Sequence, residues 1–140
     1  MSKQAVASPR LVISNPRGGK ASTMQLTPQQ FALFLGKRVG DQLDGDAMGL
    51  KGSYIKITGG TDRDGFPMRR DVSGGRKVGV LLTGPPGFHP REKPPSKKKK
   101  RRNRRTVKGL RKRVTVRGDT ISDAIAQINV VLIPKEVQKA

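Results

Sequence analysis

A dense run of cations dominates the chemistry available to this chain. Eight of the nine residues from 97 to 105 are Lys or Arg, and the wider segment 91–117 holds 15 cations against one acid. Side chains at this density can neutralise a row of phosphates, and solubility alone requires far fewer. A solvated linker would carry the same charges, so that interpretation stays open beside a phosphate-binding arm. Because Pro94 and Pro95 precede it and its centre has no apolar residue, the run is expected to be extended or disordered when free.

The remaining residue patterns do not build a catalytic or metal site. The chain contains no Cys, which excludes disulfides, thiolate zinc sites and Cys nucleophiles. Residues 18–21 lack the full P-loop pattern, because Ser14 stands at the first Gly position and Ala21 at the hydroxyl position, and they are better explained as a hairpin turn. Asp62 and Asp64 meet Gly65 too early for a calcium loop, so roles in a turn are expected. The single histidine, His89, has no nucleophile motif beside it, and we expect no enzymatic activity, cofactor or metal.

The composition is that of a single domain with a polyanionic partner. The chain has 140 residues and a net charge of +20, and one domain usually takes roughly 100–200 residues. Leu, Ile, Val and Phe supply about 24% of the residues, enough for a small core since disorder is typical below roughly 20%. No apolar run approaches the ~20 residues of a membrane span, and residues 1–10 lack the apolar region of a signal peptide. We therefore expect a cytoplasmic protein whose partner is nucleic acid rather than a membrane.

The first third of the chain predicts a hairpin followed by a short helix. Residues 10–14 form an apolar run typical of a strand, and residues 15–19 form a turn that leads into a returning strand over 20–26. Thr27 is the expected N-cap of the helix, with a Pro at the first helical position. Gln30 is expected to close a capping box, and Gly36 ends the helix after about two turns.

The rest of the chain predicts short strands separated by glycines. Residues 53–58 alternate, with Ile55 and Ile57 on one face, whereas 78–83 is expected to be a more buried strand. A further strand is expected over 128–133, closed by a Pro, and residues 119–126 form a turn or a single helical turn. The predicted fold is mainly β: a small β-barrel-like domain with one short helix in its N-terminal half and an extended basic arm.

The predicted organisation has one domain. Residues 1–9 are expected to be a flexible N-terminus and residues 135–140 a flexible C-terminus. Between them, residues 10–134 are expected to form a single β-rich domain that binds nucleic acid, interrupted by a segment at 94–108 that we call the basic arm. Most of the excess positive charge lies in and beside this arm.

One segment is too particular to be a generic turn. Residues 59–72 read Gly-Gly-Thr-Asp-Arg-Asp-Gly-Phe-Pro-Met-Arg-Arg-Asp-Val. This closely resembles the signature of the small-subunit ribosomal protein six family of archaea and eukaryotes, which is unrelated to the bacterial protein of the same number. Three further blocks, within 40–58, 80–90 and 109–129, resemble the family in the same order. The resemblance covers roughly residues 10–133.

The resemblance implies a β-barrel-like domain that is a structural component bound to small-subunit ribosomal RNA, without catalysis. Basic positions within the matching motifs are implied RNA-binding residues. They are Lys56, Arg63, Arg69, Arg70, Arg111, Lys112, Arg113 and Arg117. Gly59, Gly60 and Gly65 are expected to serve turns or close backbone approaches.

The basic arm departs from the family, which passes almost directly from the 80–90 block to the 109–118 block. Its role in RNA binding is therefore inferred from charge alone. The residues assigned to RNA on this ground are Arg91, Lys97, Lys98, Lys99, Lys100, Arg101, Arg102, Arg104, Arg105 and Lys108. The chain also stops soon after Ile133, which resembles the shorter archaeal branch.

We expect a structural constituent of the small ribosomal subunit, acting in translation. Its expected partners are small-subunit ribosomal RNA, bound through phosphate contacts of the arm and of β-domain edges, and neighbouring ribosomal proteins, with no small-molecule substrate. The alternative is a free nucleic-acid-binding or chromatin-like basic protein, which composition alone would also allow.

Overall fold

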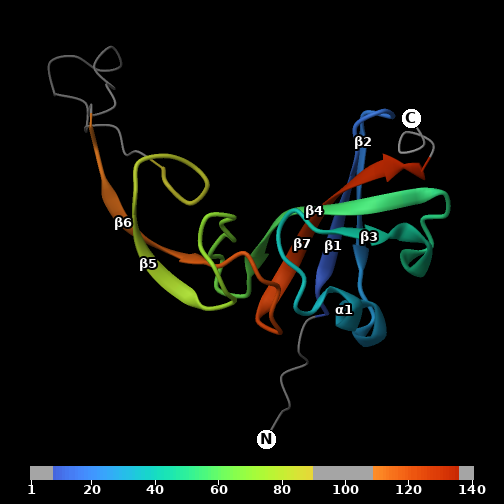
Figure 1. The fold of residues 1–140 in the computed structure, drawn as a ribbon, viewed down its shortest axis with the longest axis horizontal. Helices are drawn as coiled ribbons and strands as arrows, with labels where there is room; N and C mark the ends of the chain where they lie inside the picture. The colour runs from blue at the N-terminus through green and yellow to red at the C-terminus, as the bar shows by residue number, and fades with distance from the viewer. Residues whose placement is uncertain (1–7, 90–108, 136–140) are drawn as a thin grey trace, which may run out of the picture.

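The computed structural model describes residues 8–89 and 109–135, which form two sheets with one helix (Figure 1). The elements are β1 (Arg10–Asn15), β2 (Lys20–Gln25), α1 (Pro28–Phe34), β3 (Gln42–Asp44), the 3-10 helix η1 (Gly45–Met48), β4 (Ser53–Asp62), β5 (Lys77–Leu82), β6 (Lys112–Arg117) and β7 (Ile125–Pro134). The basic arm lies outside the described residues, as do residues 1–7 and 136–140 of the expected flexible termini.

The larger sheet has five strands in the order β2-β1-β7-β4-β3. Strand β7 lies at its centre, parallel to β1 and antiparallel to β4. The mainly-β class is therefore confirmed. The barrel-like closure is not: over residues 8–89 and 109–135, the edge strands β2 and β3 do not pair with each other, so this sheet is open.

The core lies on one face of the five-stranded sheet. The predicted alternation in β4 is confirmed, because Ile55 and Ile57 are fully buried while Lys56 between them is exposed. The register places Ile57 beside Val130 of β7, and residues of β1 continue the same apolar face. Phe34 from α1 packs into this cluster and is fully buried.

The capping box predicted for the helix is present. The Thr27 hydroxyl accepts the Gln30 backbone N–H at 3.3 Å, and the Gln30 side chain accepts the Thr27 N–H at 3.1 Å. Both signals are local in sequence, and the helix that they start ends at Phe34, close to the predicted stop at Gly36. The hairpin before it is also confirmed, with Asn15 paired to Lys20 across the turn.

Strands β5 and β6 form a separate two-stranded ribbon that extends away from the larger sheet (Figure 1). The expectation that 78–83 is a more buried strand is wrong. Leu81 is 57% exposed, and of the strand's residues only Leu82 is buried. Each strand of a two-stranded ribbon has only one neighbouring strand. The small apolar cluster of Leu82, Phe88 and Val116 packs on one face of the ribbon, so Leu81 on the other face stays exposed.

Several elements differ from the expected boundaries. Strands β3 and β6 and the helix η1 were not among the predicted elements, and β4 continues to Asp62 rather than ending at Thr58. The strand expected over 128–133 begins earlier, at Ile125. Of the two alternatives for residues 119–126, the turn is present, and the Asp119 side chain accepts the Gly74 N–H at 3.2 Å.

Two of the three motif glycines serve the expected purposes. A Cβ on Gly60 would lie 2.6 Å from the Gln127 carbonyl oxygen and 2.9 Å from the Met68 sulfur, so a close backbone approach requires glycine there. Gly65 has a φ of +87° in the turn after β4. Gly59 differs, because a Cβ there would meet open space.

Candidate nucleic-acid interface

A buried ion pair joins the two sheets. Asp62, at the end of β4, accepts the backbone N–H groups of Asp64 at 2.9 Å and Phe66 at 2.8 Å through one oxygen. Its other oxygen accepts the Arg117 Nε–H at 2.9 Å, and the two side chains are 1% and 13% exposed. The turn role expected of Asp62 is therefore confirmed, and Arg117 of β6 is committed to a contact within the chain.

The electrostatics of Asp62 follow from these contacts. Burial raises the pKa of its carboxyl group. This effect is outweighed by the hydrogen bond and positive charge of Arg117 and by the N–H groups of Phe66 and Asp64, all of which lower the pKa. The net effect is a pKa below the ordinary value of 3.8. Arg117 also donates to the Gly75 carbonyl at 2.8 Å, so its guanidinium is held on both sides.

Arg69 is likewise engaged within the chain. It makes two hydrogen bonds of 2.8 Å to the Asp71 carboxylate, and it donates to the Pro86 carbonyl at 2.6 Å and the Gly84 carbonyl at 3.3 Å. The hydrogen bond to Asp71 raises the pKa of Arg69, and the same bond lowers the pKa of Asp71. Arg69 thus connects the loop at residues 84–86 to residues 69–71, which follow the turn after β4.

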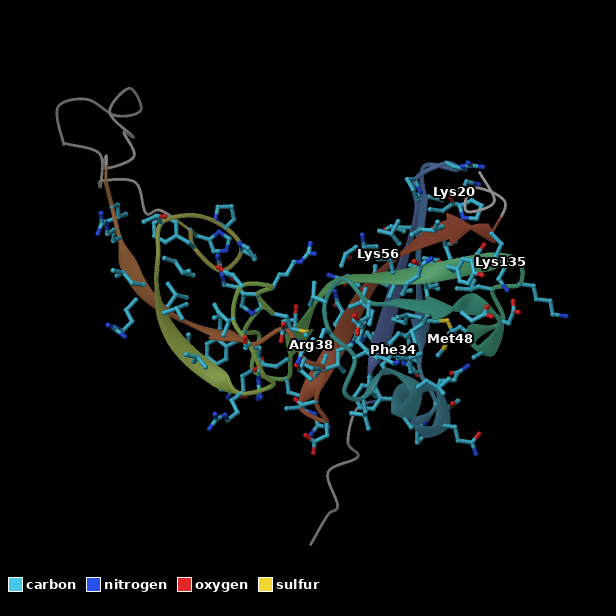
Figure 2. All side chains as sticks on the ribbon, viewed as in Figure 1. Lys20, Phe34, Arg38, Met48, Lys56 and Lys135 are labelled. Carbon is cyan, nitrogen blue, oxygen red and sulfur yellow. The ribbon has the colours of Figure 1, made fainter. Side chains whose placement is uncertain are left out.

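Other predicted RNA-binding residues are exposed. Lys56 projects from β4, and Figure 2 shows it away from Phe34 and the core. Arg63 is exposed but donates to the Asp123 carbonyl at 3.2 Å. Arg70 is exposed beside Gly40, where a Cβ on the glycine would lie 3.6 Å from the Arg70 Nη2 atom.

A second exposed group lies at the far end of the ribbon. Arg111 precedes β6, and Lys112 and Arg113 begin it; all three are exposed. Lys112 pairs with Leu82 and Arg113 with Leu81. The pair Lys77–Arg117 lies at the other end of the ribbon, where Arg117 contacts Asp62. The chain enters this end of the ribbon directly after the basic arm.

A cleft of about 570 Å³ brings together three of the predicted cations. Lys56, Arg69 and Arg70 all line it. The other lining residues come from segments far apart in sequence: Val39, Gly40, Ile57, Thr58, Met68, Asp71 and Pro86. Sequence reasoning did not find this cleft, because no local pattern joins residues 39–40 to residues 56–58.

The remaining predicted RNA-binding residues lie outside the described residues: Arg91, Lys97, Lys98, Lys99, Lys100, Arg101, Arg102, Arg104, Arg105 and Lys108. Within residues 8–89 and 109–135, no group of three or more His, Cys, Asp or Glu side chains could hold a metal ion. No helix in the same part of the chain is long and apolar enough to cross a membrane.

The open mixed sheet, the ribbon and their exposed cations define a small, basic, β-rich protein. Comparison with known families makes this more specific: the family model of Ribosomal protein S6e matches residues 9–140. The chain belongs to this family, which confirms the resemblance seen in the sequence motifs.

Three archaeal relatives show the extent of the similarity, and each is named Small ribosomal subunit protein eS6. The Staphylothermus marinus protein is 44% identical over 113 residues, which are 81% of this chain and 45% of the relative. The Methanocaldococcus jannaschii protein is 40% identical over 126 residues, covering 89% of this chain and 81% of the relative. The Archaeoglobus fulgidus protein is 42% identical over 125 residues, covering 89% and 85%. The chain thus spans less than half of the first relative and most of the other two.

Family membership also bears on catalysis. The relatives are ribosomal proteins by name, which confirms the expectation that this chain is not an enzyme.

Proposed function

We propose that this protein is a structural component of the small ribosomal subunit and binds ribosomal RNA through phosphate contacts. The proposal is supported first by family membership, since the relatives are named as small ribosomal subunit proteins. The net charge of +20 supplies the matching chemistry, because RNA is a polyanion. Neighbouring ribosomal proteins are the further expected partners.

The observation that carries RNA binding is the placement of Arg111, Lys112 and Arg113. They are exposed at the end of a ribbon that reaches away from the five-stranded sheet. In sequence, only two residues separate the basic arm from Arg111, so the cations of the arm and of the ribbon tip follow each other along the chain. A narrow ribbon suits this task because it can bring its exposed cations to an RNA backbone without any rearrangement of the core of the larger sheet.

Phosphate contacts make a quantitative prediction for affinity. If about eight arm cations meet phosphates, log K should fall with log salt at a slope of roughly −6 to −7. Binding of this kind is strong but does not depend on base sequence, so contacts of the folded domain must determine where on the RNA the protein binds.

Sedimentation tests the proposal directly. The protein should migrate with small subunits through moderate salt, and Lys97 to Arg105 should resist trypsin in intact subunits but not in the free protein. Migration in a soluble or DNA-bound fraction would instead indicate the alternative, a free nucleic-acid-binding protein. Trypsin cleavage of the arm in intact subunits, with the protein still attached, would contradict only the role of the arm.

A further inference from the structure

The cleft beside β4 has rigid walls. The Gly40 N–H donates to the Ile57 carbonyl at 2.7 Å, and the Ile57 N–H donates to the Asp41 carbonyl at 2.9 Å, so residues 39–41 are fixed along the strand. Elsewhere in the lining, Arg69 holds Pro86 and Asp71 by the hydrogen bonds described above. A cleft fixed in this way can bind a ligand without first ordering its own walls.

The lining combines apolar surface with uncompensated positive charge. Val39 and Pro86 contribute the accessible apolar surface, with Ile57 and Met68 buried behind it, and Arg69 is neutralised by Asp71. Lys56 and Arg70 form no ion pair with any residue in the described part of the chain. Arg70 also lies against Gly40, which has no side chain to displace its guanidinium plane.

These features fit a ligand with one anionic group and one flat, weakly polar body. A free inorganic anion would satisfy the two cations and leave the apolar surface exposed to water. A base-paired helix would present phosphates but could not place a base between the walls. A nucleotide taken out of its stack offers both parts, because its base has a flat face and its phosphate carries the negative charge.

We propose that this cleft receives one unstacked nucleotide of the bound RNA. Its base lies against Val39 and the backbone of β4, and its phosphate is held by Lys56 and Arg70. The volume of about 570 Å³ lies within the range of small-ligand sites. This inference rests on the proposed function, and it gives the folded domain a contact that a flexible basic segment could not make.

The test uses the full chain bound to small-subunit ribosomal RNA, cross-linked by ultraviolet light, digested with nuclease and protease, and analysed by mass spectrometry. A nucleotide adduct is expected on peptides containing residues 39–40, 56–58 or 68–71. Thr58→Phe fills the cleft without changing charge, and should lower adduct yield at least tenfold and RNA affinity about five- to tenfold. Arg70→Gln should weaken binding and reduce the salt slope by about 0.7–0.9.

Thr23→Phe on β2 is the matched control, since Thr23 is also an exposed threonine of the same sheet and lies outside the cleft. It should leave adducts and affinity unchanged. RNA binding with adducts elsewhere but none on the cleft peptides would overturn the nucleotide site and leave the proposed function standing. Failure of the wild-type chain to bind the RNA at all would overturn the proposed function. Carbodiimide coupling of Lys56 to a carboxylate of a neighbouring protein in intact subunits would show an acidic peptide in the cleft and overturn the inference.

Discussion

The Asp62 carboxylate and the Arg117 guanidinium lie 2.9 Å apart and join β4 of the five-stranded sheet to β6 of the ribbon. Asp62 belongs to the family motif, whereas Arg117 follows the basic arm, so the pair connects segments 55 residues apart in sequence. Both side chains are largely buried, and the ribbon's orientation on the core depends on this contact together with the hydrogen bonds between residues 67–69 and Arg117.

Removing one partner of this pair should destabilise the protein. Asp62→Asn keeps an oxygen for the turn N–H groups but leaves Arg117 without its counter-charge, and should lower the free energy of unfolding by about 3 kcal/mol. Urea denaturation measures the change. The control is Asp64→Asn, two residues away, which removes an exposed pair with Lys77 and should cost less than about 1 kcal/mol. Equal losses for the two variants would contradict a special role for the buried pair.

Acid should weaken the same contact. The pKa of Asp62 is lower in the folded protein than its ordinary value of 3.8, so its contribution is complete well above pH 3.8 and is lost as pH falls through the folded pKa. The difference in unfolding free energy between wild type and Asp62→Asn should therefore be smaller at pH 3 than at pH 7. A gap that widens on acidification would mean that the pKa of Asp62 is raised.

Gly118 permits a crossing of two backbones. A Cβ there would lie 1.8 Å from the Gly74 carbonyl oxygen, a separation that requires the main chain to move. Gly118→Ala should therefore cost about 3 kcal/mol in thermal or urea unfolding. Gly84→Ala is the control, because a Cβ on Gly84 meets nothing within 4 Å, and it should change stability by less than about 0.5 kcal/mol. A mild effect at Gly118 would show that the segment 73–75 shifts easily.

The ribbon tip should contribute to RNA affinity and little to folding. Arg113 is exposed, so Arg113→Gln should leave the unfolding free energy within about 0.5 kcal/mol of wild type. Filter binding to small-subunit ribosomal RNA at several salt concentrations should show weaker binding and a salt slope reduced by about 0.9. Arg17→Gln, in the exposed turn between β1 and β2, is the charge-matched control and should change the slope less. Equal effects would indicate that net charge alone governs binding.

Local signals were sufficient for the first third of the fold. The capping box of Thr27 and Gln30 uses atoms three residues apart, and the hairpin before it closes across a four-residue turn. In such cases the residues that form the contact also form the pattern. The alternation of Ile55 and Ile57 is readable for the same reason, since one face of β4 is buried along its length.

Long-range contacts were beyond the reach of sequence reasoning. The apolar run at 78–83 resembles a core strand, but its burial depends on how many partners surround it, and β5 has one. Asp62 was correctly assigned to a turn, yet its pairing with Arg117 depends on the arrangement of two sheets. The cleft needs residues 39–40, 56–58 and 68–71 together, and only the folded chain places them side by side.

The position of β7 at the centre of the sheet sets the order in which the domain can form. Its residues pair with β1, from the beginning of the described chain, and with β4, from the middle. The β1–β2 hairpin can form early during synthesis, but Leu11 and Ile57 have no common neighbour until Ile128 and Val130 arrive between their strands. The basic arm precedes β7 in sequence, so its cations are synthesised before the strand that completes the sheet.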